Sequence, residues 1–198
     1  MYRIELREYP LVWFTAHAFW VLYDGDDLIG ELHGFATDHK TGRWKTIGTA
    51  RDALRAWSYP LPGQPSRIPS TGSANGGFSG IWRPGQASRS VFEADRADAL
   101  ARWDRGLLAA QALNDANIGY SLLGGAPDDI TTGNSNTVFR TFGDVMDLQM
   151  PKVKALVRPG ERKNVLPRQT YAGLYDDTRV GSDDTRVAAD DARTSAGP

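Results

Sequence analysis

The sequence predicts an α+β fold in which an antiparallel sheet packs on two main helices. Residues 11–23 and 28–36 are rich in β-branched and aromatic side chains and flank a polar turn at 24–27, a pattern typical of a β-hairpin. Apolar side chains recur at helical spacing over 91–114 and again over 135–148. With 198 residues, 40% of them hydrophobic, the chain is long enough to bury one core.

Between the hairpin and the first main helix, the sequence predicts shorter elements. A strand is expected from Trp44 to Ile47 and a short helix over 50–57. Residues 58–90 contain too much Gly, Pro and Ser to hold regular structure for long, apart from a short strand around Phe78 to Trp82. A loop of this length in a compact domain is usually functional or disordered.

The two main helices carry their own signals. Ser90 is expected to cap the first, with Glu93 completing a capping box. Its core-facing residues are expected to be Leu100, Trp103, Leu107 and Ala110. The buried face of the second is marked by Val138, Phe139, Phe142, Val145 and Met146.

These elements predict a single domain over residues 1–165, followed by a tail over 171–198. The tail repeats the pentapeptide DDTRV at 176–180 and 183–187 and has few large apolar residues. Such a segment buries too little surface to offset the entropy of ordering, so we expect it to be disordered.

Composition excludes several classes of protein. A net charge of -1, with 23 basic residues that form no stripe, provides no field to attract nucleic acid. The absence of cysteine excludes disulfides, cysteine zinc sites and a thiol nucleophile. No apolar run approaches the length of about 20 residues that a membrane span needs, and no signal-peptide pattern is present. The expected location is the cytoplasm, or the exterior by a route without a cleaved signal.

The candidate catalytic residues are His17, His33 and Ser135. The two histidines lie on the two strands of the hairpin, and Ser135 opens the second main helix. By strand alternation, His17 shares a face with Thr15, Phe19 and Val21, and His33 with Ile29 and Glu31. If the imidazoles lie on one face, one can orient the other, as the third group of a triad orients its base.

A helix N-terminus favours negative charge and offers backbone N–H groups for an oxyanion hole, to which Asn134 or Asn136 adds a side-chain donor. The simpler alternative is structural: Ser135 or Asn134 is only an N-cap, and the histidines are core residues. A metal site of the three histidines, including His39, with Asp38 or Glu31 matches no familiar spacing, so neither metal nor cofactor is predicted.

The order of these elements resembles the circularly permuted papain-like hydrolases, which include lecithin:retinol acyltransferase-like enzymes and permuted NlpC-type peptidases. The segments that carry the resemblance are AHAFWVLYDGDDLIGELHG, ALARWDRGLLAAQAL, the Tyr-Ser-Leu-Leu-Gly stretch and a helix opened by Asn-Ser-Asn, within residues 11–150. The resemblance implies that His17 is the catalytic base, His33 the orienting residue and Ser135 the nucleophile, preceded by Asn134.

The chain departs from that family at the nucleophile, which is Cys in the family and Ser135 here. Three interpretations stay open: an enzyme that uses Ser, an inactive site that only binds, or an enzyme inactivated by a Cys-to-Ser change.

Two functions follow from the sequence. The first is an amide or ester hydrolase, or acyl-transfer enzyme, acting on a peptide, isopeptide or lipid-like substrate. In that function the loop over 58–90 covers the cleft and Trp82 lines the site. The second is an inactive interaction domain on the same fold, which contacts a protein partner through that loop and the tail.

Overall fold

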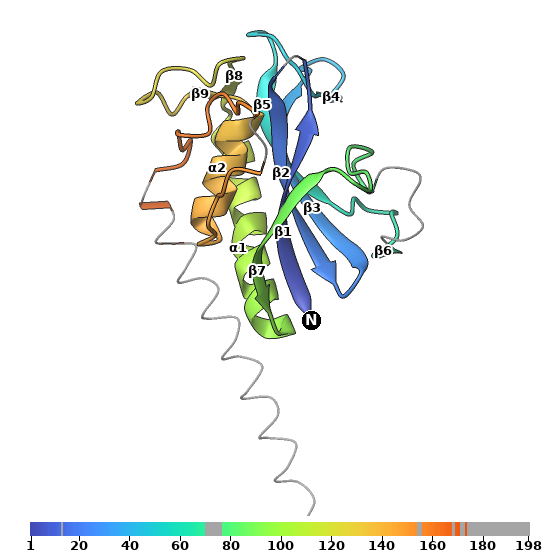
Figure 1. Ribbon diagram of the computed structural model, residues 1–198. Helices are drawn as coiled ribbons and strands as arrows, with labels where there is room; N and C mark the ends of the chain where they lie inside the picture. The colour runs from blue at the N-terminus through green and yellow to red at the C-terminus, as the bar shows by residue number, and fades with distance from the viewer. Residues whose placement is uncertain (13, 70–76, 154–155, 168, 171–172, 174–198) are drawn as a thin grey trace, which may run out of the picture.

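The computed structural model describes residues 1–12, 14–69, 77–153, 156–167, 169–170 and 173. Within these ranges nine strands form one curled, mixed sheet, and two helices pack against one of its faces (Figure 1). The strands are β1 (Tyr2–Pro10), β2 (Ala16–Asp24), β3 (Asp27–Thr37), β4 (Trp44–Lys45), β5 (Ala53–Tyr59), β6 (Ile68–Pro69), β7 (Ala87–Ala94), β8 (Gly119–Tyr120) and β9 (Thr132–Gly133). The helices are α1 (Arg96–Asp115) and α2 (Ser135–Val145).

The sheet order is β7-β1-β2-β3-β5-β8-β9, and β4 and β6 pair with β3 outside this path. The predicted hairpin is confirmed as β2 and β3, joined by a turn between Asp24 and Asp27. Neighbouring strands are antiparallel except for β8 and β9, which are parallel. The α+β class is therefore confirmed, although the sheet is mixed and not purely antiparallel.

One face of the sheet is covered by α1 and α2. The predicted buried face of α2 is confirmed, because Val138, Phe139, Phe142, Val145 and Met146 are all buried in this core. The helix approaches β3 closely at Gly34, where a Cβ atom would lie 2.5 Å from Cβ of Val138. A side chain at this position would therefore push α2 away from the strand.

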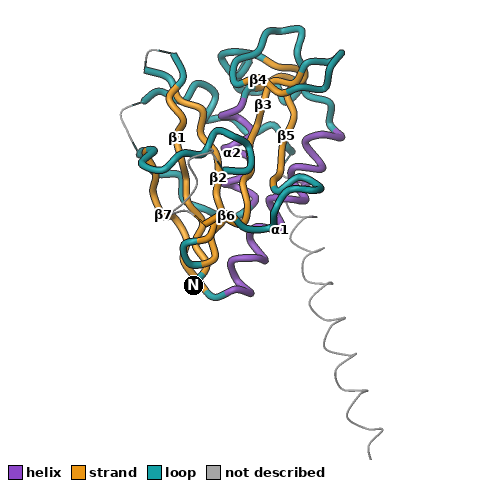
Figure 2. Tube along the Cα trace, turned by 90° about the vertical axis from the view of Figure 1, so that its right-hand side faces the viewer, coloured by secondary structure: helices purple, strands orange, loops and turns teal. Residues whose placement is uncertain are grey.

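The opposite face holds a second, mainly aromatic cluster. It contains Phe19, Val21, Tyr23, Leu28, Phe35, Tyr59, Phe78, Ile81 and Trp82. Three of these residues, Phe78, Ile81 and Trp82, lie in the irregular segment that follows residue 77, so this part of the long loop covers the face that the helices leave open (Figure 2). The short strand expected there does not form: a turn is followed by irregular backbone at Ile81 and Trp82.

Several predicted boundaries and elements are wrong. The helix expected over 50–57 is strand β5, because its backbone pairs with β3 over seven residues and its side chains alternate between the two cores. The first main helix begins at Arg96 with Asp95 as its cap, since Ser90 and Glu93 belong to β7. Of its expected core residues, Trp103 and Ala110 are buried, Leu100 is partly buried and Leu107 is exposed.

The N-terminal strand β1 was not expected, although Ile4 and Leu6 alternate with charged residues there and both are buried. Conversely, the strand expected to start at residue 11 begins at Ala16. The expected tail lies outside the described residues, apart from residue 173. Among the described helices none is both long enough and apolar enough to cross a bilayer.

Candidate functional site

His17, His33 and Glu31 form a hydrogen-bonded chain across the hairpin. Nε2 of His17 lies 3.0 Å from Nδ1 of His33, and Nε2 of His33 lies 2.8 Å from Oε2 of Glu31. All three residues are fully buried. The rings of Phe19 and Phe35 stack against both imidazoles, so the chain is shielded from water on the face opposite the helices.

A β-bulge decides which residues share the face of His33. The β2–β3 register shifts between Leu22 and Tyr23, whose partners on β3 are Gly30 and Leu28. The expected neighbour Ile29 therefore packs against the helix-covered core, whereas Glu31 stays beside His33. The alternation expected for His17 is confirmed for Phe19, on which it stacks, and for Val21, which belongs to the same cluster, whereas Thr15 lies before β2 begins.

Glu31 also holds the loop that closes this face. Its Oε1 accepts the backbone N–H of Phe78 at 2.7 Å, and its Oε2 accepts the hydroxyl of Ser79. These partners lie 47 and 48 residues away in sequence. The carboxylate therefore couples the histidine pair to the long loop.

When His33 is neutral, the contacts specify one tautomer for each histidine. A carboxylate can only accept hydrogen bonds, so Nε2 of His33 donates to Glu31 and Nδ1 of a neutral His33 must accept. Nε2 of His17 then donates to His33, which leaves the basic lone pair of His17 on Nδ1. Burial, reinforced by the nearby His33, holds the pKa of His17 well below its ordinary value, so its imidazole is neutral at pH 7.

Nδ1 of His17 is buried and has no hydrogen-bond partner within the described part of the chain. A buried nitrogen without a partner costs stability, and such groups occur where chemistry requires them. His17 is therefore a neutral imidazole with one ring nitrogen that no described residue contacts by a hydrogen bond.

Asn136 ties the start of α2 to the backbone on both sides of His17. Its amide oxygen accepts the N–H of Ala18 at 3.1 Å, and its amide nitrogen donates to the carbonyl of Ala16 at 3.0 Å. The β2–β3 ladder covers only Trp20 to Asp24, so the two strands separate before they reach this end of β2. In Figure 2 the strands here fall into two groups, with β1 and β2 apart from β3 and β5. Asn136 occupies the place of a strand neighbour in this opening.

Asn134 is the N-cap of α2, as the simpler interpretation of this residue predicted. Its side-chain oxygen accepts the N–H groups of Asn136 and Thr137, and its amide nitrogen donates to the carbonyls of Leu122 and Pro159. Both amide donors are therefore used, so Asn134 has none left for an oxyanion. Asn136 uses only one of its two amide donors.

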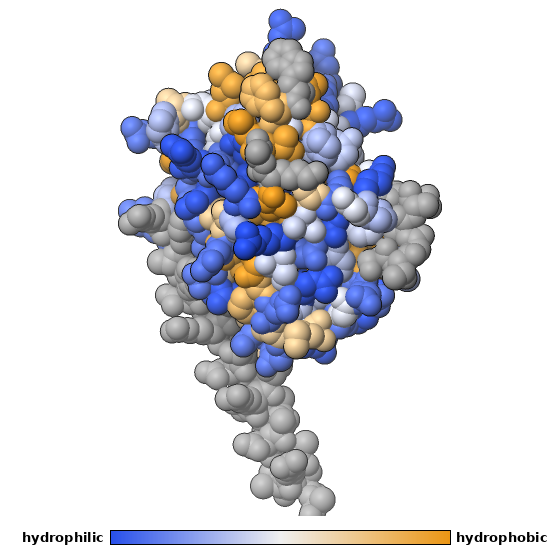
Figure 3. All heavy atoms as spheres, in the orientation of Figure 1, coloured by the Kyte–Doolittle hydropathy of each residue, from blue (hydrophilic) through white to orange (hydrophobic). Residues whose placement is uncertain are grey.

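Ser135 lines an apolar pocket of about 530 Å³. The described residues that line the pocket come from four segments and from the start of α2: Leu11, Val12, Phe14, Thr15, Ala16, Thr46, Ile47, Tyr120, Leu122, Leu123, Asn134, Ser135, Asn136, Val157 and Pro159. Six of its lining residues are exposed large hydrophobics, namely Val12, Phe14, Ile47, Leu122, Leu123 and Val157. Figure 3 shows hydrophobic residues gathered at the end of the molecule where α2 begins in Figure 1.

The structure brings His17 and His33 together but shows no hydrogen bond between either imidazole and Ser135 among the described residues. His17 packs on the face opposite α2, whereas Ser135 is the first residue of α2 and lines the apolar pocket. Trp82 is not part of the pocket: it is buried in the aromatic cluster, where its indole N–H donates to the hydroxyl of Tyr23 at 2.7 Å.

His39 is exposed in the connection after β3, away from the other two histidines in the core. Across the described ranges, no group of three or more His, Cys, Asp or Glu side chains is placed to hold a metal ion.

Sequence reasoning placed Glu31 on the face of His33 but gave it no part in the catalytic group, and it did not bring Ser79 to the histidines. The signal for Glu31 was its position two residues before His33, which puts both on one face of a strand. Ser79 carried no such signal, because only the folded loop brings it to Glu31.

Comparison with protein families, curated proteins and solved structures finds no match to this chain.

Proposed function

We propose that the protein is an amide or ester hydrolase, or an acyl-transfer enzyme, in which Ser135 is the nucleophile and His17 the base. The observation that carries the proposal is the Asn136 bridge, which attaches the residue next to Ser135 to the backbone on both sides of His17. The lone pair on Nδ1 of His17, which has no partner in the described part of the chain, supports it.

In the proposed reaction, the Ser135 hydroxyl attacks a carbonyl carbon while Nδ1 of His17 accepts its proton. The collapsing tetrahedral intermediate expels the leaving group, which takes that proton, and an acyl-enzyme remains. Water then attacks the ester by the same route and restores Ser135; in acyl transfer, an acceptor replaces water. Glu31 and His33 keep the His17 tautomer fixed throughout.

Two groups are placed to stabilise the oxyanion in this proposal. The second amide N–H of Asn136 and the backbone N–H of Ser135 have no partner within the described residues, and both lie at the positive end of α2. The apolar pocket favours a substrate with a lipid-like acyl group over a polar peptide.

Labelling with a fluorophosphonate probe tests the proposal. The intact chain is expected to be phosphonylated, Ser135→Ala to lose labelling completely, and His17→Gln to label at least about a hundredfold more slowly because the general base is gone. Ser88→Ala, which removes an exposed hydroxyl on β7, is the matched control and is expected to label normally. Equal labelling of Ser135→Ala and the intact chain would reject Ser135 as the nucleophile.

A binding domain without catalysis is the second candidate, and the exposed hydrophobic residues around the pocket favour it. In this alternative the rim, with the long loop and the tail, contacts a protein partner. Ser135→Ala would then keep full binding of that partner, whereas Phe14→Ser and Leu123→Ser would weaken it. Loss of turnover in Ser135→Ala, with a substrate in hand, would exclude this alternative.

A further inference from the structure

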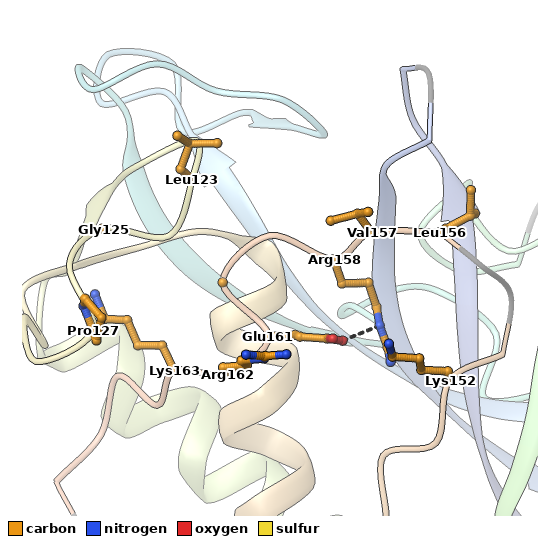
Figure 4. Close-up of a pocket in the computed structure, with 11 residues that line it drawn as sticks. Leu123, Gly125, Pro127, Lys152, Leu156, Val157, Arg158, Glu161, Arg162 and Lys163 are labelled. Atoms are coloured by element: carbon orange, nitrogen blue, oxygen red, sulfur yellow. Dashed lines mark ion pairs between the residues drawn. The ribbon is translucent and has the colours of Figure 1, made fainter.

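A groove of about 700 Å³ adjoins the Ser135 pocket and has the opposite chemistry. It runs between the loop after β8 and residues 156–163, and it shares Leu123 and Val157 with the pocket. Its charged lining residues are Lys152, Arg158, Glu161, Arg162 and Lys163. Figure 4 shows Arg158 and Lys152 on one side and Lys163 on the other, beside Pro127. Cations therefore outnumber carboxylates along the groove.

Arg158 is the fixed, buried element of this groove. Its Nε lies 2.5 Å from a carboxylate oxygen of Glu161 and 3.7 Å from one of Glu8, and its Nη2 donates to the carbonyl of Pro151 at 3.4 Å. Only 3% of the side chain is exposed, and Nη1 is buried without a hydrogen-bond partner among the described residues. A buried guanidinium donor without an acceptor is costly, and an anion in the groove would supply the acceptor.

Lys163 contributes a second buried cation. Its Nζ donates to the carbonyls of Gly124 at 2.9 Å and Thr132 at 2.7 Å, which uses two of its three N–H bonds. Neither partner is a carboxylate, so these contacts position the ammonium group; the carboxylate that acts on its charge is that of Asp129, which does not line the groove. A Cβ on Gly125 would lie 3.0 Å from Nζ, so glycine keeps this wall of the groove open.

The remaining cations are exposed. Lys152 and Arg162 form no ion pair with any described residue, and they flank the Arg158–Glu161 pair. Exposed cations beside a buried, fixed one are the arrangement by which proteins recognise carboxylate and phosphate groups.

We propose that this groove binds the anionic group, a carboxylate or a phosphate, of a ligand whose apolar part occupies the adjoining Ser135 pocket. That this ligand is a substrate rests on the function proposed above, whereas its binding to the groove does not depend on that function. An apolar pocket and a basic groove that share two residues select an amphipathic, negatively charged compound over a neutral one of equal length.

Calorimetric titration of the full chain with octyl phosphate, octanoate, 1-octanol and inorganic phosphate tests the proposal. At low ionic strength the better of the two anionic octyl compounds is expected to bind about tenfold more tightly than octanol, and which one it is identifies the anion. The double variant Lys152→Gln/Arg162→Gln is expected to lose about tenfold in affinity for that compound, since two exposed charge contacts are removed, and to leave octanol binding unchanged. Added salt should weaken the anionic ligand alone.

The matched control is Lys40→Gln/Arg51→Gln, which removes two exposed cations elsewhere and is expected to bind as the intact chain does. Equal affinity for octanol and both anionic compounds would overturn the proposal, as would unchanged affinity in the groove variant. Inorganic phosphate that binds as tightly as octyl phosphate would also overturn it, because the apolar pocket would then contribute nothing. Titration of Ser135→Ala separates the two proposals, since that variant should keep the anion preference even if probe labelling fails.

Discussion

The two faces of the sheet are stabilised by different interactions. Under α1 and α2, aliphatic and aromatic side chains pack together. The separation between the helices and the sheet is set by close contacts such as that of Gly34 on β3 with Val138 on α2. On the other face, aromatic rings surround two histidines and a glutamate, and a loop takes the place of a helix. Burying such polar groups is favourable only when each has a partner, so the second face depends on a specific hydrogen-bond network where the first depends on volume.

The largest expected effect tests the helix-covered face. Phe142→Ala should lower the free energy of unfolding by about 3–5 kcal/mol, because the removed ring leaves a cavity in a close-packed core. The loss should be the same at pH 7.5 and pH 5.5, since the substitution neither adds nor removes an ionisable group. Urea denaturation at the two pH values measures both quantities.

The control for this variant is Phe14→Ala, which removes an exposed ring at the pocket rim and should change stability by about 0.5 kcal/mol or less. A similar loss for both variants would contradict the view that packing in this core carries the stability of the helix-covered face.

On the opposite face, a substitution that changes the hydrogen-bonding groups but not the volume should lower the free energy of unfolding. Glu31→Gln keeps the shape but puts an amide where three donors point, so we expect a loss of about 2–3 kcal/mol. Because the amide can donate to His33, the His33 tautomer should also invert. Nitrogen-15 NMR of the histidine side chains reports this inversion directly.

Glu93→Gln is the matched control for Glu31→Gln, because Glu93 is exposed on β7. It should leave both stability and the histidine spectra unchanged. If Glu31→Gln keeps the wild-type tautomers, then Glu31 does not set the state of the histidine pair, and its contribution is confined to holding the loop.

The contrast between the faces also explains what the sequence could predict. The buried side of α2 follows from its helical periodicity, and the hairpin follows from two β-branched, aromatic runs around a turn, because both signals are local. Strand β5 was mistaken for a helix, since its conformation is decided by pairing with β3 and not by its own propensity.

Long-range contacts set the limit at the candidate site. His17, His33 and Ser135 could be chosen from their local context, but the pairing of the histidines depends on the hairpin register, which a bulge shifts between Leu22 and Tyr23. The Asn136 bridge joins residues about 120 positions apart, and the pocket is assembled from four separate loops, so neither leaves a periodic signal in the sequence. The prediction that Trp82 lines the site was wrong because a long-range contact decides its position: its loop folds onto the face opposite the helices.

The smallest effect concerns the protonation of His17. Its pKa lies well below the ordinary value in the folded chain but near 6.5 in the unfolded chain, so only the unfolded state takes up a proton as the pH falls below about 6.5. The free energy of unfolding should therefore drop by about 1 kcal/mol between pH 7.5 and 5.5 on account of His17. His17→Phe keeps a ring in the aromatic stack and should lack this part of the pH dependence, whereas His39→Asn, at an exposed position, should retain it. Equal slopes for His17→Phe and the intact chain would mean that His17 titrates normally in the fold, and the buried network would then lose the neutral base on which the difference between the two faces depends.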